Sequence, residues 1–137
     1  MTVFVDTSAF YAAADSRDLH HASAMELLSG TDNLVTTDHV LVESWRLMRD
    51  RGGHKSADRF WQALRGGHAV VETVLPGDLD VAWRIGEVFP DQDFSIVDRT
   101  SFAVMERLGL TRVATFDDHF SIYRFGPRRQ FAFDVNR

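Results

Sequence analysis

The stretch VFVDTSAF, residues 3–10, runs from a short apolar segment directly into a carboxylate, Asp6. An unbroken apolar run with β-branched residues is typical of a strand buried on both faces, so we predict a strand over residues 2–6. A helix is predicted over residues 8–14. Asp6 therefore stands where a strand gives way to a helix. A carboxylate at this point either caps a helix or turn, or faces the crevice that parallel sheets form at the carboxyl ends of their strands.

The rest of the chain repeats this alternation of strand and helix. Further strands are predicted over residues 34–37, 69–75, 112–116 and 131–135. Helices are predicted over residues 17–29, 39–50, 55–65, 78–89 and 95–108, with Asp38 as N-cap of the second of these and Gly-Gly pairs after the second and third. Strands that alternate with helices imply an α/β fold. We expect a three-layer α/β/α sandwich with a central, mostly parallel sheet.

Length and composition limit the class of protein. The 137 residues contain no linker or internal repeat, which predicts a single domain over residues 1–137. There is no cysteine, so disulfides and thiolate metal ligands are excluded. No apolar run reaches the ~18 residues of a membrane span, and no basic segment precedes the first apolar run as in a signal peptide. We therefore expect a soluble, cytoplasmic protein without membrane contact.

The charge distribution bears on nucleic-acid binding. A net charge of −5 argues weakly against it. All but one of the 15 basic residues are arginine, however, and several of them cluster in residues 46–59 and 124–129. A single surface arginine is usually solvated or ion-paired, but the planar guanidinium group also matches phosphate geometry. A local basic rim could thus hold phosphates on an acidic protein.

Four carboxylates fall at or shortly after predicted strand ends. Asp6 and Asp117 directly follow the first and fourth predicted strands, whereas Glu43 and Asp98 lie about one turn into helices, beside apolar stripes. Taken singly, each is more often structural than catalytic. Asp98, for example, stands three residues after Ser95, which is the spacing of a capping box.

Together, the four acids predict a metal site. Carboxylates gathered in one crevice repel each other by ~4 kcal/mol per pair at about 4 Å and an effective dielectric constant near 20. Without cysteine, the compensating charge should be a hard divalent cation, Mg²⁺ or Mn²⁺. Such ions activate water and stabilise charge on phosphoryl oxygens. We predict that Asp6, Asp98 and Asp117 hold one or two ions, and that Glu43 ligates metal or orients the attacking water.

Four short motifs extend this interpretation. They are VFVDTSAF (3–10), LVES (41–44), FSIVDRTSFAVM (94–105) and VATFDDHF (113–120). In their order and spacing these motifs resemble those of the PIN-domain nucleases, and in particular the toxin ribonucleases of bacterial VapBC toxin–antitoxin pairs. The resemblance spans nearly the whole chain.

The resemblance implies an Mg²⁺- or Mn²⁺-dependent endoribonuclease that cleaves single-stranded RNA or structured RNA such as tRNA or rRNA. It also implies a homodimer that a cognate antitoxin protein silences. The family's acidic quartet maps onto Asp6, Glu43, Asp98 and Asp117 as catalytic residues. Its small hydroxyl residues, which position ligands or substrate, map onto Thr7 or Ser8 beside the first acid and onto Ser95 or Thr100 near the third.

Several alternatives stay open. Asp118 neighbours Asp117 and is a second candidate ligand or a helix cap, and Asp93 is a candidate to join the site through the cap of the Asp98 helix. His39 and His119 are interpreted as packed or capping residues rather than catalytic ones. Arg99 is a candidate contact for phosphate or for an antitoxin carboxylate, or a surface ion pair. The three tryptophans, at 45, 61 and 83, are interpreted as core or dimer interface.

Other functional classes fit less well. A receiver domain needs a lysine in its acidic crevice, and the only lysine, Lys55, lies in a helical stretch. A haloacid-dehalogenase phosphatase needs Asp-x-Asp after the first strand, which DTS does not provide. A PIN nuclease of RNA maturation and a catalytically silent PIN scaffold are the nearer alternatives to a toxin.

Overall fold

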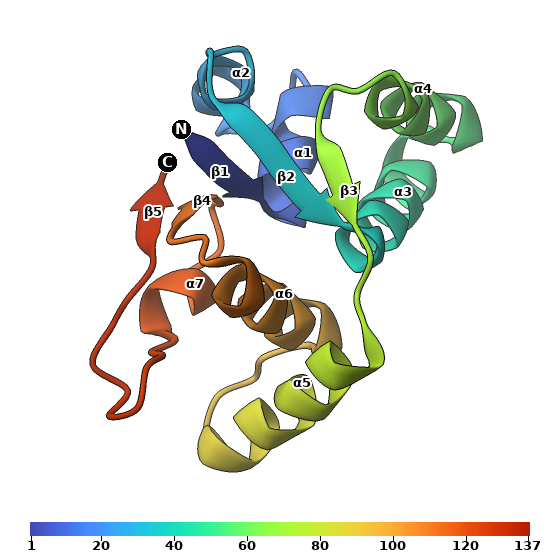
Figure 1. The fold of residues 1–137 in the computed structure, drawn as a ribbon. Helices are drawn as coiled ribbons and strands as arrows, with labels where there is room; N and C mark the ends of the chain where they lie inside the picture. The colour runs from blue at the N-terminus through green and yellow to red at the C-terminus, as the bar shows by residue number, and fades with distance from the viewer.

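All five strands form one sheet, in which every neighbouring pair is parallel. The computed structural model describes residues 1–137 and orders the strands β3-β2-β1-β4-β5 (Figure 1). The mostly parallel sheet predicted from the sequence is therefore confirmed. The strands are β1 (Thr2–Val5), β2 (Asn33–Thr37), β3 (Val70–Glu72), β4 (Arg112–Ala114) and β5 (Asp134–Asn136).

Two layers of helices cover the sheet, and the predicted three-layer sandwich is confirmed. Parallel strands are joined by right-handed crossovers, so connections that run in opposite directions along the sheet lie on opposite faces. Figure 1 accordingly shows α1 to α4 on one side and α5 to α7 on the other. The helices are α1 (Thr7–Ala14), α2 (His21–Leu28), α3 (Asp38–Gly52), α4 (His54–Arg65), α5 (Pro76–Val88), α6 (Ile96–Leu108) and α7 (His119–Ile122). None of them is both long and apolar enough to cross a bilayer.

The hydrophobic core centres on β1. Phe4 and Val5 have no exposed surface, as expected of a strand covered on both faces. On the α6 side, Phe102 stacks on Tyr123 with ring centroids 4.3 Å apart and meets Phe120 edge-on at 5.0 Å. This aromatic cluster fixes α7 and the segment after it against α6.

The strand order places a topological switch point between β1 and β4, and the region at the carboxyl ends of these two strands is here called the crevice. The chain leaves β1 towards β2 on one side, and it leaves β4 towards β5 on the other. At such a switch point the two connections diverge and expose the carboxyl ends of both strands, where ligands bind in open α/β sheets. The backbone N–H of Asp6 donates to the carbonyl of Ala114 at 3.1 Å, so the first residue after β1 is held beside the last residue of β4.

The predicted start of α2 and the predicted N-cap of α3 are wrong because side chains redirect the local hydrogen bonds. The predicted start of α5 at residue 78 is also wrong, since this helix begins at Pro76. Helix α2 begins at His21 rather than at residue 17, since Asp18 accepts the His20 N–H through its carboxylate (2.8 Å) and forms a turn. The N-cap of α3 is Thr37 rather than Asp38, because the Thr37 hydroxyl accepts the Val40 N–H at 3.1 Å.

The carboxyl-terminal part differs most from the prediction. Helix α7 was not predicted, and β5 begins three residues later than the predicted strand over 131–135, because Phe131 instead pairs with Phe125 in an isolated antiparallel bridge. Strands β3 and β4 are shorter than predicted. The interpretation as core is wrong for Trp61 and Trp83, which are 46% and 70% exposed, whereas Trp45 packs against the core.

Candidate active site

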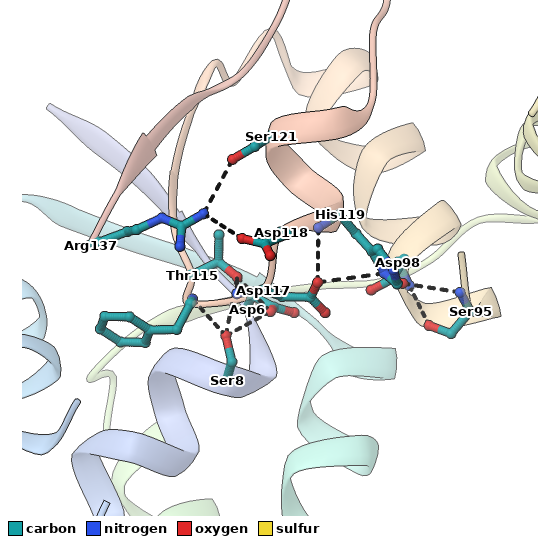
Figure 2. Close-up of polar contacts among 11 residues, drawn as sticks. Asp6, Ser8, Ser95, Asp98, Thr115, Asp117, Asp118, His119, Ser121 and Arg137 are labelled. Carbon is teal, nitrogen blue, oxygen red and sulfur yellow. Dashed lines mark hydrogen bonds and ion pairs between the residues drawn. The ribbon is translucent and has the colours of Figure 1, made fainter. Parts of the chain in front are cut away.

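Asp6 is buried at the head of the crevice, although its carboxylate caps no helix. It occupies the N-cap position of α1 without a side-chain capping bond. Its Oδ2 instead accepts hydrogen bonds from the hydroxyls of Thr115 (2.9 Å) and Ser8 (3.1 Å), as Figure 2 shows. Burial raises the pKa of Asp6 to about 6, and repulsion from Asp98 adds to the shift. The fold thus fixes the position of Asp6 in a buried environment that destabilises its ionised form.

The hydroxyls on Asp6 also join the ends of β1 and β4. Ser8 Oγ accepts the Phe116 N–H at 2.9 Å, and Thr115 Oγ1 accepts the Asp117 N–H at 3.0 Å. Ser8 was predicted to position ligands or substrate, and its hydroxyl donates to the Asp6 carboxylate. Thr115 was not predicted, because its only signal in the sequence is a hydroxyl two residues before Asp117.

Asp98 lies in the first turn of α6, in the predicted capping box. Its Oδ2 accepts the Ser95 N–H and the Ser95 hydroxyl accepts the Asp98 N–H, both at 3.0 Å. The same Oδ2 lies 2.7 Å from Nδ1 of His119, which donates to it. Burial raises the pKa of Asp98 and repulsion from Asp117 adds to this, outweighing the hydrogen bonds from His119 and Ser95. The Asp98 carboxylate therefore both caps α6 and belongs to the candidate site.

Asp117 completes a compact group with Asp98 and His119. One ligand atom from each of these three residues lies within 4.8 Å of the others. Asp117 Oδ1 accepts the His119 N–H at 2.9 Å, which orients the carboxylate towards Asp98 (Figure 2). Burial lowers the pKa of His119, but its bond to Asp98 and the charges of Asp117, Asp98 and Asp93 outweigh this and raise it. The packed-residue interpretation of His119 missed this contact with both acids.

The neighbouring acids lie outside this group. Asp118 is 80% exposed on its side chain and pairs with Arg137 at 3.0 Å, so the geometry favours Asp117 over Asp118 as a site residue. Asp93 is exposed and forms no side-chain hydrogen bond, although its charge reaches His119. Arg99 forms no ion pair, since its Nε donates to the Phe94 carbonyl at 2.9 Å.

Glu43 faces the same crevice from α3. The Thr7 hydroxyl donates to its Oε1 at 2.6 Å, which ties α3 to the start of α1. Burial raises the pKa of Glu43, and the charges of Asp98 and Asp117 contribute to the shift. Thr100, in contrast, is buried and bonds to the Val97 carbonyl and His39, away from the carboxylates. Asp98 and Asp117 therefore lie close together, and the charges of Asp6 and Glu43 interact with this pair. Thr7, Ser8 and Ser95 bond to these acids, whereas Thr100 does not.

The donor set fits a hard divalent cation. In each acid the hydrogen bonds described above use a single oxygen, so the second oxygen remains free to bind an ion. These free oxygens belong to Asp6, Glu43, Asp98 and Asp117. Carboxylate oxygens held in fixed orientations are the ligands that Mg²⁺ and Mn²⁺ prefer. Burial raises the pKa values of Asp6, Glu43 and Asp98, and the charges of neighbouring acids add to these shifts. A bound cation would neutralise this negative charge.

The fold and this acidic crevice agree with comparison to known proteins. The family model of the PIN domain matches residues 3–126. The chain belongs to the PIN domain family, which confirms the resemblance derived from the four motifs and, with it, the predicted class of enzyme, a nuclease.

One relative is similar along most of its length. The 23S rRNA-specific endonuclease VapC20 of Mycobacterium tuberculosis, in strains CDC 1551 and H37Rv, is 35% identical over 125 residues, covering 90% of this chain and 95% of the relative. The crystal structure of M. tuberculosis VapC20, described as a sarcin–ricin loop cleaving toxin, superposes with a TM-score of 0.81 at 34% identity. That match covers 88% of this chain and 93% of the other.

Proposed function

We propose that this protein is a divalent-metal-dependent endoribonuclease that acts as the toxin of a toxin–antitoxin pair, with the sarcin–ricin loop of 23S rRNA as its substrate. The proposal of metal-dependent chemistry rests on the four carboxylates near the switch point between β1 and β4, each of which is oriented by hydrogen bonds. The similarity to VapC20 over 90% of the chain supports the choice of RNA. Unpaired nucleotides in this loop would satisfy the proposed preference for single-stranded RNA.

Three of the four acids would bind metal, and the fourth would activate water. Asp6, Asp98 and Asp117 would hold Mg²⁺ or Mn²⁺, which when bound lowers the pKa of water and stabilises charge on the phosphoryl oxygens. Glu43 lies at the rim of the group, and its raised pKa suits a base that accepts a proton from the attacking water. Thr7 fixes the orientation of Glu43, whereas Ser8 and Thr115 fix Asp6.

Arg46 supplies a phosphate contact beside the acids. It stands three residues after Glu43 on α3, so both side chains project from the same face of the helix. Arg46 is exposed and forms no ion pair, whereas Arg49 pairs with Asp50 and Arg51 lies over the Tyr11 ring. A free guanidinium at this position would hold an RNA phosphate, and binding would weaken with salt.

Cleavage of a defined RNA tests the nuclease proposal. An RNA hairpin with the sarcin–ricin loop sequence should be cut in Mn²⁺ or Mg²⁺ and stay intact in EDTA. Asp98→Asn should lower the rate by at least 100-fold, because removing a charge from the group removes a metal ligand. Asp118→Asn, whose carboxylate points away, should cut at the wild-type rate. Equal rates for Asp98→Asn and wild type would overturn the proposed chemistry.

The proposal extends to partners and compartment. An apolar hollow between α1, α2 and α4, lined by Phe10, Met25 and Phe60 among others, supports binding of an antitoxin segment.

Exposed apolar side chains on α5 and at the start of α6 support a homodimer. They are Leu79, Trp83, Val88 and Ile96. A cytoplasmic location follows from the proposed ribosomal substrate. Size-exclusion chromatography with light scattering tests the dimer, and co-purification with the product of an adjacent small gene tests the antitoxin.

A further inference from the structure

Two aromatic rings stack on each other beside the carboxylates. His20, just before α2, and Phe116, just after β4, have ring centroids 4.4 Å apart and planes inclined by only 7°. His20 is exposed and Phe116 is partly exposed. Phe116 packs against the hydrophobic core with part of its surface, whereas the His20 side of the pair faces solvent and is available to a ligand.

Hydrogen bonds fix the backbone of the two residues that carry the rings. The Phe116 N–H donates to the Ser8 hydroxyl, which also bonds Asp6, so Phe116 is fixed to the network that orients that acid. The His20 N–H donates to Asp18 at 2.8 Å, and the His20 carbonyl accepts the Ala24 N–H at 2.9 Å. The aromatic pair is thus preformed, and the backbone of Phe116 is fixed relative to Asp6. Little conformational entropy would be lost when a ligand binds it.

Its position matches a nucleotide next to the phosphate that is cut. Phe116 lies between Thr115, which bonds Asp6, and Asp117, so its Cα is ~3.8 Å from that of a proposed metal ligand. One face of the His20 ring covers Phe116, and the exposed side of the pair can receive a further ring. Aromatic side chains stack on unpaired bases of any type, because every base has a π-face, whereas paired bases in a helix are already stacked.

We propose that the pair of His20 and Phe116 is a stacking platform for an unpaired base of the substrate RNA, in a nucleotide next to the phosphodiester bound at the carboxylates. This inference rests on the proposed ribonuclease function and adds a means of selecting single-stranded RNA. His20 and Phe116 contribute binding and orientation of the substrate, and the carboxylates contribute the chemistry.

The first test measures stacking without cleavage. Full-length Asp98→Asn protein binds hairpins with the sarcin–ricin loop sequence that each carry one 2-aminopurine at a different loop position. Quenching is expected at a position adjacent to the cleaved phosphate, and it should be lost when His20→Ala is added. Replacement of His20 by Trp should restore it. Quenching that is equal with and without His20→Ala at every position would overturn the proposal.

The second test pairs the protein change with a change in the RNA. In the wild type, an abasic nucleotide at the stacked position should raise KM by about 5- to 150-fold, the range of one base–aromatic stack. In His20→Ala and in Phe116→Leu, which keeps apolar bulk but not the flat ring, the abasic change should have little further effect. His54→Ala, an exposed histidine at the start of α4, should respond as the wild type does.

The outcomes separate the two proposals. If the abasic penalty is the same in His20→Ala as in the wild type, the platform is wrong while the nuclease proposal stands. If the wild type cuts no RNA, the nuclease proposal fails, and the quenching experiment still decides whether the rings bind a base. Thermal unfolding of each variant checks that it is folded, and the Phe116→Leu variant gives a second reading if His20→Ala is unstable.

Discussion

At the scale of single residues, Asp6 shows most directly the conflict between folding and the proposed chemistry. Its carboxylate is almost fully buried, and burial raises its pKa to about 6. Burying an ionised group without a counter-charge destabilises a fold. Ser8 and Thr115 offset part of this cost but use one oxygen only. Under the proposed function, a divalent cation bound to the other oxygen would offset the rest of this cost.

Asp6→Asn should abolish cleavage and yet stabilise the metal-free protein at pH 7. The amide removes the buried charge but keeps the shape and one hydrogen-bond acceptor, so the free energy of unfolding should rise by about 1–3 kcal/mol. Urea unfolding in metal-free buffer measures this. The control is Asp118→Asn, an exposed carboxylate whose change should stay within ~0.5 kcal/mol. A destabilised Asp6→Asn protein would contradict the argument.

The same carboxylate predicts how stability depends on pH. The pKa of Asp6 is about 6 in the folded protein against an ordinary value of 3.8. Between these pH values the folded state binds more protons than the unfolded state, so the free energy of unfolding falls as the pH rises through this window. The loss attributable to Asp6 is on the order of 3 kcal/mol.

Unfolding of the metal-free protein at pH 4, 5, 6 and 7 measures this dependence. Asp6→Asn should flatten the profile without removing it, because the pKa values of Glu43 and Asp98 are also raised and give slopes of the same sign. If Asp6→Asn and the wild type show the same pH dependence of the free energy of unfolding, groups other than Asp6 cause it.

At the scale of elements, α5 and α6 are joined by a nearly buried ion pair that sequence patterns did not reveal. Arg107 binds both oxygens of Asp78 at 3.0 Å, and Asp78 also accepts the Leu75 N–H as part of the α5 capping box. These bonds lower the pKa of Asp78 despite its burial. The pair lies away from the carboxylate crevice and fixes the helix that carries Asp98.

Arg107→Ala should destabilise the fold by about 2 kcal/mol. The change leaves Asp78, which is 3% exposed, without its counter-charge. The estimate is below the full cost of a buried pair because the Arg107 side chain is 34% exposed. Arg84→Ala on α5, which removes an exposed arginine without an ion pair, is the control and should be near neutral. Equal unfolding midpoints for the two variants would show that the pair contributes little.

Element types were easier to predict than their ends. Apolar runs and helical stripes identified five strands and all helices except α7, which has four residues and no stripe of its own. The errors at α2 and α3 arose where a side chain, Asp18 or Thr37, competes for a backbone N–H. Such choices depend on local geometry that the composition of a segment does not reveal.

At the scale of the whole molecule, the convergence of the acids was predictable because parallel strands share a carboxyl edge. The identity of the neighbours was not: nothing in the sequence pattern places β1 beside β4, or Thr115 against Asp6. His119 was missed for the same reason, since its contact with Asp98 joins α7 to α6 and exists only once both helices pack on the sheet. The acids and the neighbouring residues Thr7, Ser8 and Ser95 could be identified from motifs. Thr115 and His119, which contact the acids from other parts of the chain, are identified only by the tertiary structure.

The assembled site predicts that divalent metal stabilises the whole fold. An ion that binds only the folded state at 100 times its Kd adds about 2.7 kcal/mol, which corresponds to roughly 10 °C in Tm for a domain of this size. Mn²⁺ should therefore raise the Tm of the wild type at pH 7, and less so at pH 5, where protons compete for the carboxylates. Asp98→Asn should lose most of the shift, whereas Asp118→Asn, which alters a carboxylate that points to Arg137, should keep it. An equal shift in Asp98→Asn and wild type would mean that the ion binds elsewhere, and the four acids would then need a different explanation.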